Sequence, residues 1–192
     1  MATLTGRRGL VIAVSGCVLA AALGLVAAGR GWVSFTVAEP PLPSLRKTAS
    51  GHAVAGAVMP LALVVLAGVV VLPATRKLGR RLAGAVIALA GIVLVVEAID
   101  VLASPRQAVA AEAVKLTGNT GARAASATAA GWPWLVVVAG VLAVAVGVLT
   151  VGWSRGWPAM GRRYDASGSA GRDKAAEASM WERFDRGDDP TI

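Results

Sequence analysis

The chain has 192 residues, of which 56% are hydrophobic and 16% are charged, and its mean hydropathy is +0.66. These values exclude an ordinary soluble domain, which carries more charge and spaces its apolar residues along faces. The net charge of +8 does not indicate nucleic-acid binding, because no basic face with interleaved aromatic residues is present. With one cysteine, Cys17, and one histidine, His52, the chain cannot form an internal disulfide, and this pair alone does not build a metal site.

Four apolar blocks of 21 or 22 residues follow one another along the chain, at residues 9–29, 53–74, 82–103 and 132–153. A helix of that length measures roughly 32 Å, enough to cross the hydrocarbon core of a bilayer. In lipid every backbone N–H and C=O must be paired within the segment, so each block is expected to be a helix. The sequence therefore predicts an all-α fold: a four-helix transmembrane bundle over residues 1–153 and a flexible cytoplasmic tail over residues 154–192.

The first block also has the outline of a signal peptide. Arg7 and Arg8 precede it, and Val14-Ser15-Gly16-Cys17 looks like a lipoprotein cleavage box. However, the apolar core before Cys17 is only about six residues long, whereas signal peptides have about 7–15. The chain also stays apolar from Val18 to Ala28. We therefore expect a retained membrane span rather than cleavage.

The orientation follows from the basic residues of the shortest connection. Between Thr75 and Arg81 the chain carries four of them, a density typical of a cytoplasmic loop. With four spans, both termini then lie inside (N-in/C-in) in the plasma membrane. Indole rings settle at headgroup level. We therefore expect tryptophans at the outer interface (Trp32, Trp132, Trp134) and at the inner one (Trp153, Trp157).

The two outer connections are expected to differ in structure. The first contains Glu39-Pro40-Pro41-Leu42-Pro43, a polyproline-like piece with little capacity for structure of its own. The second opens with Ser104-Pro105-Arg106-Gln107, a capping-box pattern. It predicts a short amphipathic helix to about Leu116, on the membrane surface or over the bundle, followed by a flexible stretch through Ala130.

Glu97 and Asp100 lie inside the third block and share one helix face, because they are three residues apart. Glu97 follows about 22 Å of apolar helix, which places it in the outer third of the membrane. One interpretation is a polar intramembrane site for a small molecule or a proton that opens outward. The other is structural: the two acids bond to cationic groups at the outer ends of neighbouring elements (His52, Arg30, Arg106).

Small residues recur at every fourth position of the first block: Gly16, Ala20, Gly24 and Ala28. Such a groove lets another helix approach closely. Packing within the bundle is one interpretation, and a homodimer seam is the other. Pro60 is expected to kink the second helix, because it removes one backbone hydrogen bond.

No feature of the sequence predicts catalysis. Ser15 and Ser34 have no base in sequence reach, and neither a phosphate-binding loop nor a nucleophile motif is present. We therefore expect no enzyme activity, no catalytic residue and no cofactor.

Several stretches together resemble the tryptophan biosynthesis-associated membrane proteins, a family of high-GC Gram-positive bacteria. The resemblance covers nearly the whole chain, and its two cytoplasmic signatures are fairly specific. Glu182 and Phe184 in the terminal segment stand where Asp and Leu are typical. The matching stretches are Gly29-Arg30-Gly31-Trp32, Arg76-Lys77-Leu78-Gly79-Arg80-Arg81, Trp132-Pro133, Trp157-Pro158-Ala159-Met160, Arg163-Tyr164-Asp165 and Trp181-Glu182-Arg183-Phe184-Asp185-Arg186-Gly187-Asp188-Asp189-Pro190-Thr191.

This resemblance implies a connection with tryptophan synthesis but no reaction and no catalytic residues. The leading hypothesis is a non-enzymatic accessory membrane protein that binds a cytoplasmic partner. The residues expected to make that contact are in the tail: Trp157, Arg163, Tyr164, Trp181 and Phe184. The alternative is a transporter or sensor of a small aromatic metabolite such as tryptophan or indole, which uses Glu97 and Asp100.

Overall fold

The computed structural model describes residues 7–38, 44–75, 77–121 and 123–153. The chain divides into two compact units, Met1–Trp157 and Pro158–Ile192, and every described residue belongs to the first. The expected tail contacts lie outside the described residues: Trp157, Arg163, Tyr164, Trp181 and Phe184.

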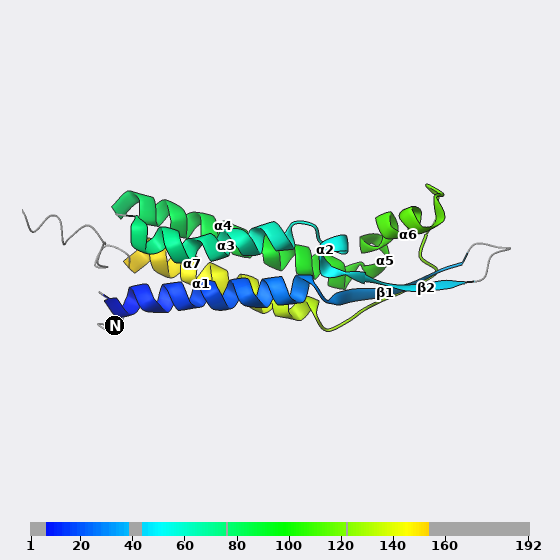
Figure 1. Ribbon diagram of the computed structural model, residues 1–192, viewed down its shortest axis with the longest axis horizontal. Helices are drawn as coiled ribbons and strands as arrows, with labels where there is room; N and C mark the ends of the chain where they lie inside the picture. Colours follow the sequence, from blue (N-terminus) through cyan, green and yellow to red (C-terminus); the bar gives the residue numbers. More distant parts are fainter. Residues whose placement is uncertain (1–6, 39–43, 76, 122, 154–192) are drawn as a thin grey trace, which may run out of the picture. The chain divides into compact units, whose positions relative to one another are not determined.

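In the part of the first unit that the structure describes, four long apolar helices pack side by side: α1 (Arg7–Ala28), α3 (Val58–Ala74), α4 (Lys77–Ala103) and α7 (Pro133–Trp153) (Figure 1). Among the described residues, three helices are long and apolar enough to cross a membrane, and these are α1, α4 and α7. α3 is equally apolar but has 17 residues, at the lower end of the length that a span requires.

Two pairs of glycines bring α4 and α7 into backbone contact. A Cβ added to Gly91 would lie 2.6 Å from the carbonyl oxygen of Gly140, and one added to Gly147 would lie 2.5 Å from that of Gly84. Only a residue without a side chain fits at such positions. Helices associate in lipid through small residues of this kind, because burial of apolar surface gives no driving force for their association there.

The small residues of α1 are also used within the chain. A Cβ on Gly16 would lie 2.5 Å from Val146 of α7, and one on Gly24 would lie 3.2 Å from Ala62 of α3. Ala20 is buried as well. The groove expected along this helix is therefore filled by α7 and α3.

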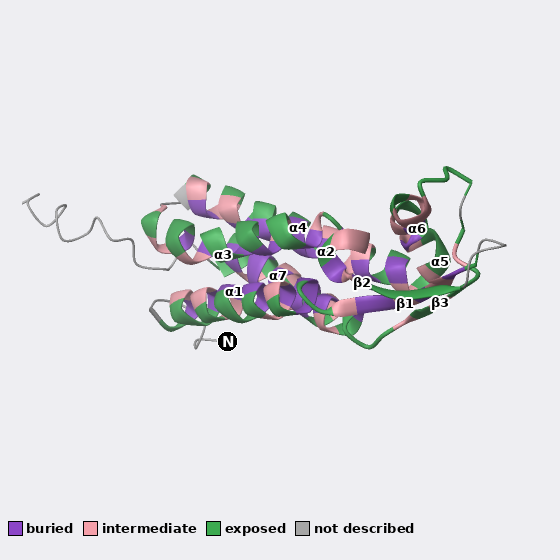
Figure 2. Ribbon diagram, turned by 45° about the vertical axis from the view of Figure 1, so that its right-hand side comes forward, coloured by how far each residue is buried: buried purple, intermediate pink, exposed green. Residues whose placement is uncertain are grey.

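Figure 2 shows exposed residues along α1, α3 and α4, and most of the large side chains among them are apolar. Among the described residues, all exposed large hydrophobic side chains except Leu45 and Trp132 lie on α1, α3, α4 or α7. Val70 is 70% exposed and Leu89 is 62% exposed. An apolar exterior this extensive is unfavourable in water and suits contact with lipid.

The expectation of an all-α fold holds only in part: the described residues are mostly helical, but they also form a three-stranded antiparallel sheet. Its strands are β1 (Gly31–Val37), β2 (Leu45–Ser50) and β3 (Ser126–Ala129), in the order β2-β1-β3. β3 lies in the stretch that was expected to be flexible. The proline-rich piece, residues 39–43, lies outside the described residues.

Three short helices accompany the sheet: α2 (Gly51–Val54), α5 (Pro105–Ala108) and α6 (Ala110–Thr117). We call these helices together with the sheet the cap. The amphipathic helix expected after Ser104 is present but is interrupted at Val109. It ends at Gly118, whose φ of 70° is left-handed and favours glycine.

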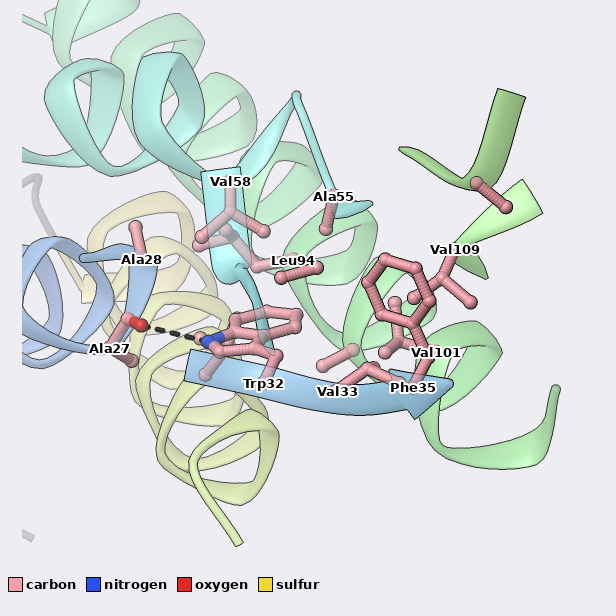
Figure 3. Packing of buried hydrophobic residues seen from close by; sticks show 14 of the residues in the cluster. Ala27, Ala28, Trp32, Val33, Phe35, Ala55, Val58, Leu94, Val101 and Val109 are labelled. Carbon is pink, nitrogen blue, oxygen red and sulfur yellow. Dashed lines mark hydrogen bonds between the residues drawn. The ribbon is translucent and has the colours of Figure 1, made fainter. Parts of the chain in front are cut away.

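The cap has its own apolar core at the ends of the helices (Figure 3). Trp32 and Phe35 of β1 pack there with Val109 of the second connection and Leu94 of α4. Trp32 is fully buried, and its indole N–H donates a 2.8 Å hydrogen bond to the carbonyl oxygen of Ala27. The protein therefore encloses this indole, which does not face the headgroup layer as expected.

The second apolar block does not form one helix from residue 53. α2 ends at Val54, and α3 begins at Val58 after a turn. Pro60 therefore falls in the first turn of α3. Backbone N–H groups of the first turn have no acceptor within the helix, so the N–H that proline lacks costs no hydrogen bond there. The expected kink at this proline has no basis in the observed helix.

Candidate functional site

A polar hollow of about 380 Å³ opens where α4 meets α2 and α5. Both acids singled out in the sequence, Glu97 and Asp100, line it. Glu97 is half-buried and Asp100 is exposed. The remaining lining combines apolar and polar side chains: Val54, Val101, Ser104, Gln107 and Ala108.

The glycine contacts fix the level of these acids along the bundle. α4 and α7 run in opposite directions and are in register at Gly91 and Gly140. Six residues further along α4, Glu97 is level with Trp134, whose indole is 60% exposed. Exposed indoles prefer the headgroup region, and Glu97 lies at the level of such an indole. Asp100 is further out, beyond the first residue of α7.

Ser104 and Gln107 line the hollow because the chain turns at Ser104. α4 ends at Ala103, and Pro105 starts α5 at a position where a missing backbone N–H costs nothing. The Ser104 carbonyl accepts the Gln107 N–H at 3.0 Å, which closes the turn. The Ser104 side chain makes no cap hydrogen bond, so the expected capping box is not formed. This turn places Ser104 and Gln107 beside the two acids.

Arg30 and His52 have other partners than these acids. The guanidinium of Arg30 lies 5.0 Å from the ring centre of Trp132, a cation–π contact. His52 Nδ1 lies 3.4 Å from the carbonyl oxygen of Ala28, and its Nε2 lies 3.3 Å from the Ser50 hydroxyl. The structure brings Glu97 and Asp100 together with each other but does not join them to Arg30 or His52.

Negative charge dominates the hollow. Among the described residues, no basic side chain contributes to its lining. The carboxylates accept hydrogen bonds and attract cations, whereas Ser104 and Gln107 both donate and accept. The apolar wall of Val54 and Val101 suits a hydrocarbon or aromatic body. Such a mixture is typical of small-molecule sites.

Arg80 is a buried charged residue that the sequence analysis treated only as an orientation signal. It is 1% exposed, inside the first turns of α4. Its Nε–H donates a 2.8 Å hydrogen bond to the carbonyl oxygen of Leu72, in the last turn of α3. A cation at this end compensates the partial negative charge of the last carbonyls. The link expected from Thr75 to Arg81 is thus largely helical.

Apolar helices with a lipid-suited exterior define this chain as an integral membrane protein. A family model described as "Tryptophan-associated transmembrane protein" matches residues 14–191. The chain belongs to this family, as the resemblance in its sequence indicated. No curated protein and no solved structure matches it significantly.

Proposed function

We propose that this protein is a non-enzymatic accessory protein of the membrane that senses a small aromatic metabolite carrying an ammonium group. The observation that carries the proposal is the hollow with Glu97 and Asp100 in its wall and apolar residues beside them. The family's association with tryptophan gives the metabolite its class.

The chemistry of the lining suits a free amino acid better than indole. The carboxylates of Glu97 and Asp100 complement an ammonium group, and charge-assisted hydrogen bonds of this kind are strong. Ser104 and Gln107 supply donors for the ligand's own carboxylate. Indole has no ammonium group and would leave both acids without a partner.

The interior of the bundle supports sensing rather than transport. Beyond the hollow, the helices are filled by an apolar cluster that includes Cys17, Val65 and Ile87. Among the described residues, the buried polar side chains are Arg80 and Thr150, which lie near the end of the helices away from the hollow. A polar ligand would therefore have no polar path from the hollow to that end.

We also propose four spans, with α3 as the short one, in the plasma membrane. Both termini are then cytoplasmic, and the cap with its hollow faces outward. The basic residues between Thr75 and Arg81 support this orientation, because positive charge is retained on the cytoplasmic side. A reporter fused after Thr75 should be inaccessible from outside intact cells, and an accessible one would overturn the orientation.

Ligand binding tests the sensing role. Purified protein in detergent should bind labelled tryptophan at least about tenfold more tightly than indole, or than indole propionate, which lacks the ammonium group. Glu97→Gln and Asp100→Asn should each weaken tryptophan binding. Glu112→Gln is the matched control, because Glu112 pairs with Lys115 on α6 and does not line the hollow. Equal binding to Glu97→Gln and wild type, or no binding at all, would refute the proposal.

A cytoplasmic partner is a second proposal, which the extent of the family match supports. The match continues to residue 191 and so includes the terminal segment with Trp181 and Phe184. Two aromatic residues three apart suit insertion into a groove of another protein. Deletion of residues 181–192 should abolish crosslinking to the partner, whereas unchanged crosslinking would exclude this segment.

A further inference from the structure

One outer strand of the sheet, β2, offers an open edge. Among the described strands, β2 has a sheet neighbour on one side only, because the strand order is β2-β1-β3. Its residues from Leu45 to Thr48 are exposed. In Figure 1 the β1–β2 hairpin projects past the ends of the long helices. An edge strand of this kind presents unpaired backbone groups to a further strand.

The hydrogen bonds of β1 identify which groups face that edge. The carbonyl of Thr36 accepts the N–H of Ala125 at 2.8 Å, and the carbonyl of Trp32 accepts the N–H of Ala130 at 2.7 Å. Both bonds run to the side of β3. In an antiparallel sheet, successive residues direct their backbone groups to opposite neighbours. The even-numbered residues of β1 therefore face β3, and the odd-numbered ones face β2.

This pattern carries over to β2 through the register. Phe35 is paired with Lys47, so the backbone groups of Lys47 are used within the β1–β2 ladder. Arg46 and Thr48 stand on either side of Lys47 in the strand, so their backbone groups face away from β1. Their N–H and C=O groups consequently point to the open edge, where a new strand would bond.

The charges on β2 determine which kind of strand can pair with its open edge. Arg46 and Lys47 are adjacent, so their side chains stand on opposite faces of the sheet. Pairing with the β2 strand of a second copy would bring like charges together across the edge, which is destabilising. A strand with acidic residues opposite both cations would be attracted. The cations thus disfavour self-pairing and favour an acidic partner.

We propose that β2 is the docking edge for an extended acidic segment of another protein. The segment adds a fourth strand and exchanges backbone hydrogen bonds with Arg46 and Thr48, the mode known as β-augmentation. Two successive acidic residues lie opposite Arg46 and Lys47, one on each face. Leu45, which is 53% exposed, gives an apolar contact at the end of the strand. This surface is independent of the hollow at Glu97.

The experiment uses the full-length protein in detergent and two fluorescent eight-residue peptides. Both consist of Val and Thr around a central pair, which is Glu-Glu in one peptide and Lys-Lys in the other. We expect the Glu-Glu peptide to bind at least about tenfold more tightly, by fluorescence anisotropy. The double variant Arg46→Glu/Lys47→Glu should reverse this preference.

Two further variants separate backbone pairing from simple attraction. Thr48→Pro removes an N–H that faces the edge but not one used in the ladder, and it should weaken binding of the Glu-Glu peptide about tenfold. Arg106→Glu reverses an exposed cation on α5 and should leave binding unchanged. Weak binding of both peptides to the wild type, or an unreversed preference in the double variant, would overturn the proposal. So would equal binding of the Glu-Glu peptide to wild type and a folded Thr48→Pro protein.

Discussion

The helices and the cap are held together by different means. α4 and α7 meet through glycines whose backbones touch, and many of their large side chains are exposed on the outside of the bundle. The cap buries its large side chains, such as Trp32 and Phe35, and keeps Ser34 and Thr36 partly exposed on the other face of β1. In lipid, association depends on close contact between backbones, whereas in water it depends on burial of apolar area. The boundary between these two kinds of packing falls at the level of Glu97, close to where the membrane surface should lie.

Removal of the Trp32 side chain should have the largest effect and should be confined to the cap. Trp32→Ala leaves a cavity and removes the indole hydrogen bond to the Ala27 carbonyl, and it should cost about 3–5 kcal/mol. Hydrogen exchange of the β1 amides should accelerate. Alkylation of Cys17, which is buried among α1, α3 and α4, should stay slow.

The control for this variant is another tryptophan. Trp134→Ala removes an indole that is 60% exposed at the first turn of α7 and should leave exchange in β1 unchanged. Equal acceleration of exchange in the two variants would contradict the division into two packing regions.

An added methyl group between α4 and α7 should have the next largest effect, and this effect should fall on the helices rather than on the cap. Gly140→Ala places a Cβ 2.7 Å from the carbonyl oxygen of Gly91, and overpacking of this kind costs about 1–3 kcal/mol. Cys17 should then react faster with a small membrane-permeant maleimide, whereas exchange in β1 should change little. Because Cys17 is the single cysteine of the chain, the labelling reports on this site alone.

The same helix supplies the control. A Cβ on Gly152 meets no atom within 4 Å, so Gly152→Ala should not change Cys17 labelling. If Gly140→Ala and Gly152→Ala labelled at the same rate, the close contact of α4 and α7 would not be what holds the helices.

The sequence predicted the helical region much better than the cap. An uninterrupted apolar run is a strong signal, because lipid leaves the backbone no alternative to a helix. β1 also carried a recognisable signal: Val33, Phe35 and Val37 alternate with Ser34 and Thr36, the period of a half-buried strand. The proline run after it favoured an irregular loop instead. β2 and β3 are short and polar, so only their pairing with β1 in the folded chain identifies them.

The candidate site was predictable in part, for similar reasons. Spacing alone placed Glu97 and Asp100 on one face of a helix. That Ser104 and Gln107 join them depends on the direction of the chain after α4, which the sequence pattern does not give. The partners of Arg30 and His52 likewise depend on how the ends of separate helices meet. Local periodicity carries no information about such contacts.

The smallest effect should come from a contact that links the two regions. Arg30 follows α1, Trp132 precedes α7, and the cation–π contact between them ties the connections at this end of the helices. Both side chains are exposed, so the contact should be worth about 0.5–1 kcal/mol. A double-mutant cycle of Arg30→Gln and Trp132→Leu, followed by thermal unfolding in detergent, measures that coupling directly. The same cycle with Arg106→Gln in place of Arg30→Gln should give a coupling near zero, because that exposed cation is not stacked on Trp132. Equal couplings in the two cycles would mean that Arg30 contributes only its charge and that the cap and the helices are joined through the buried core around Trp32 instead.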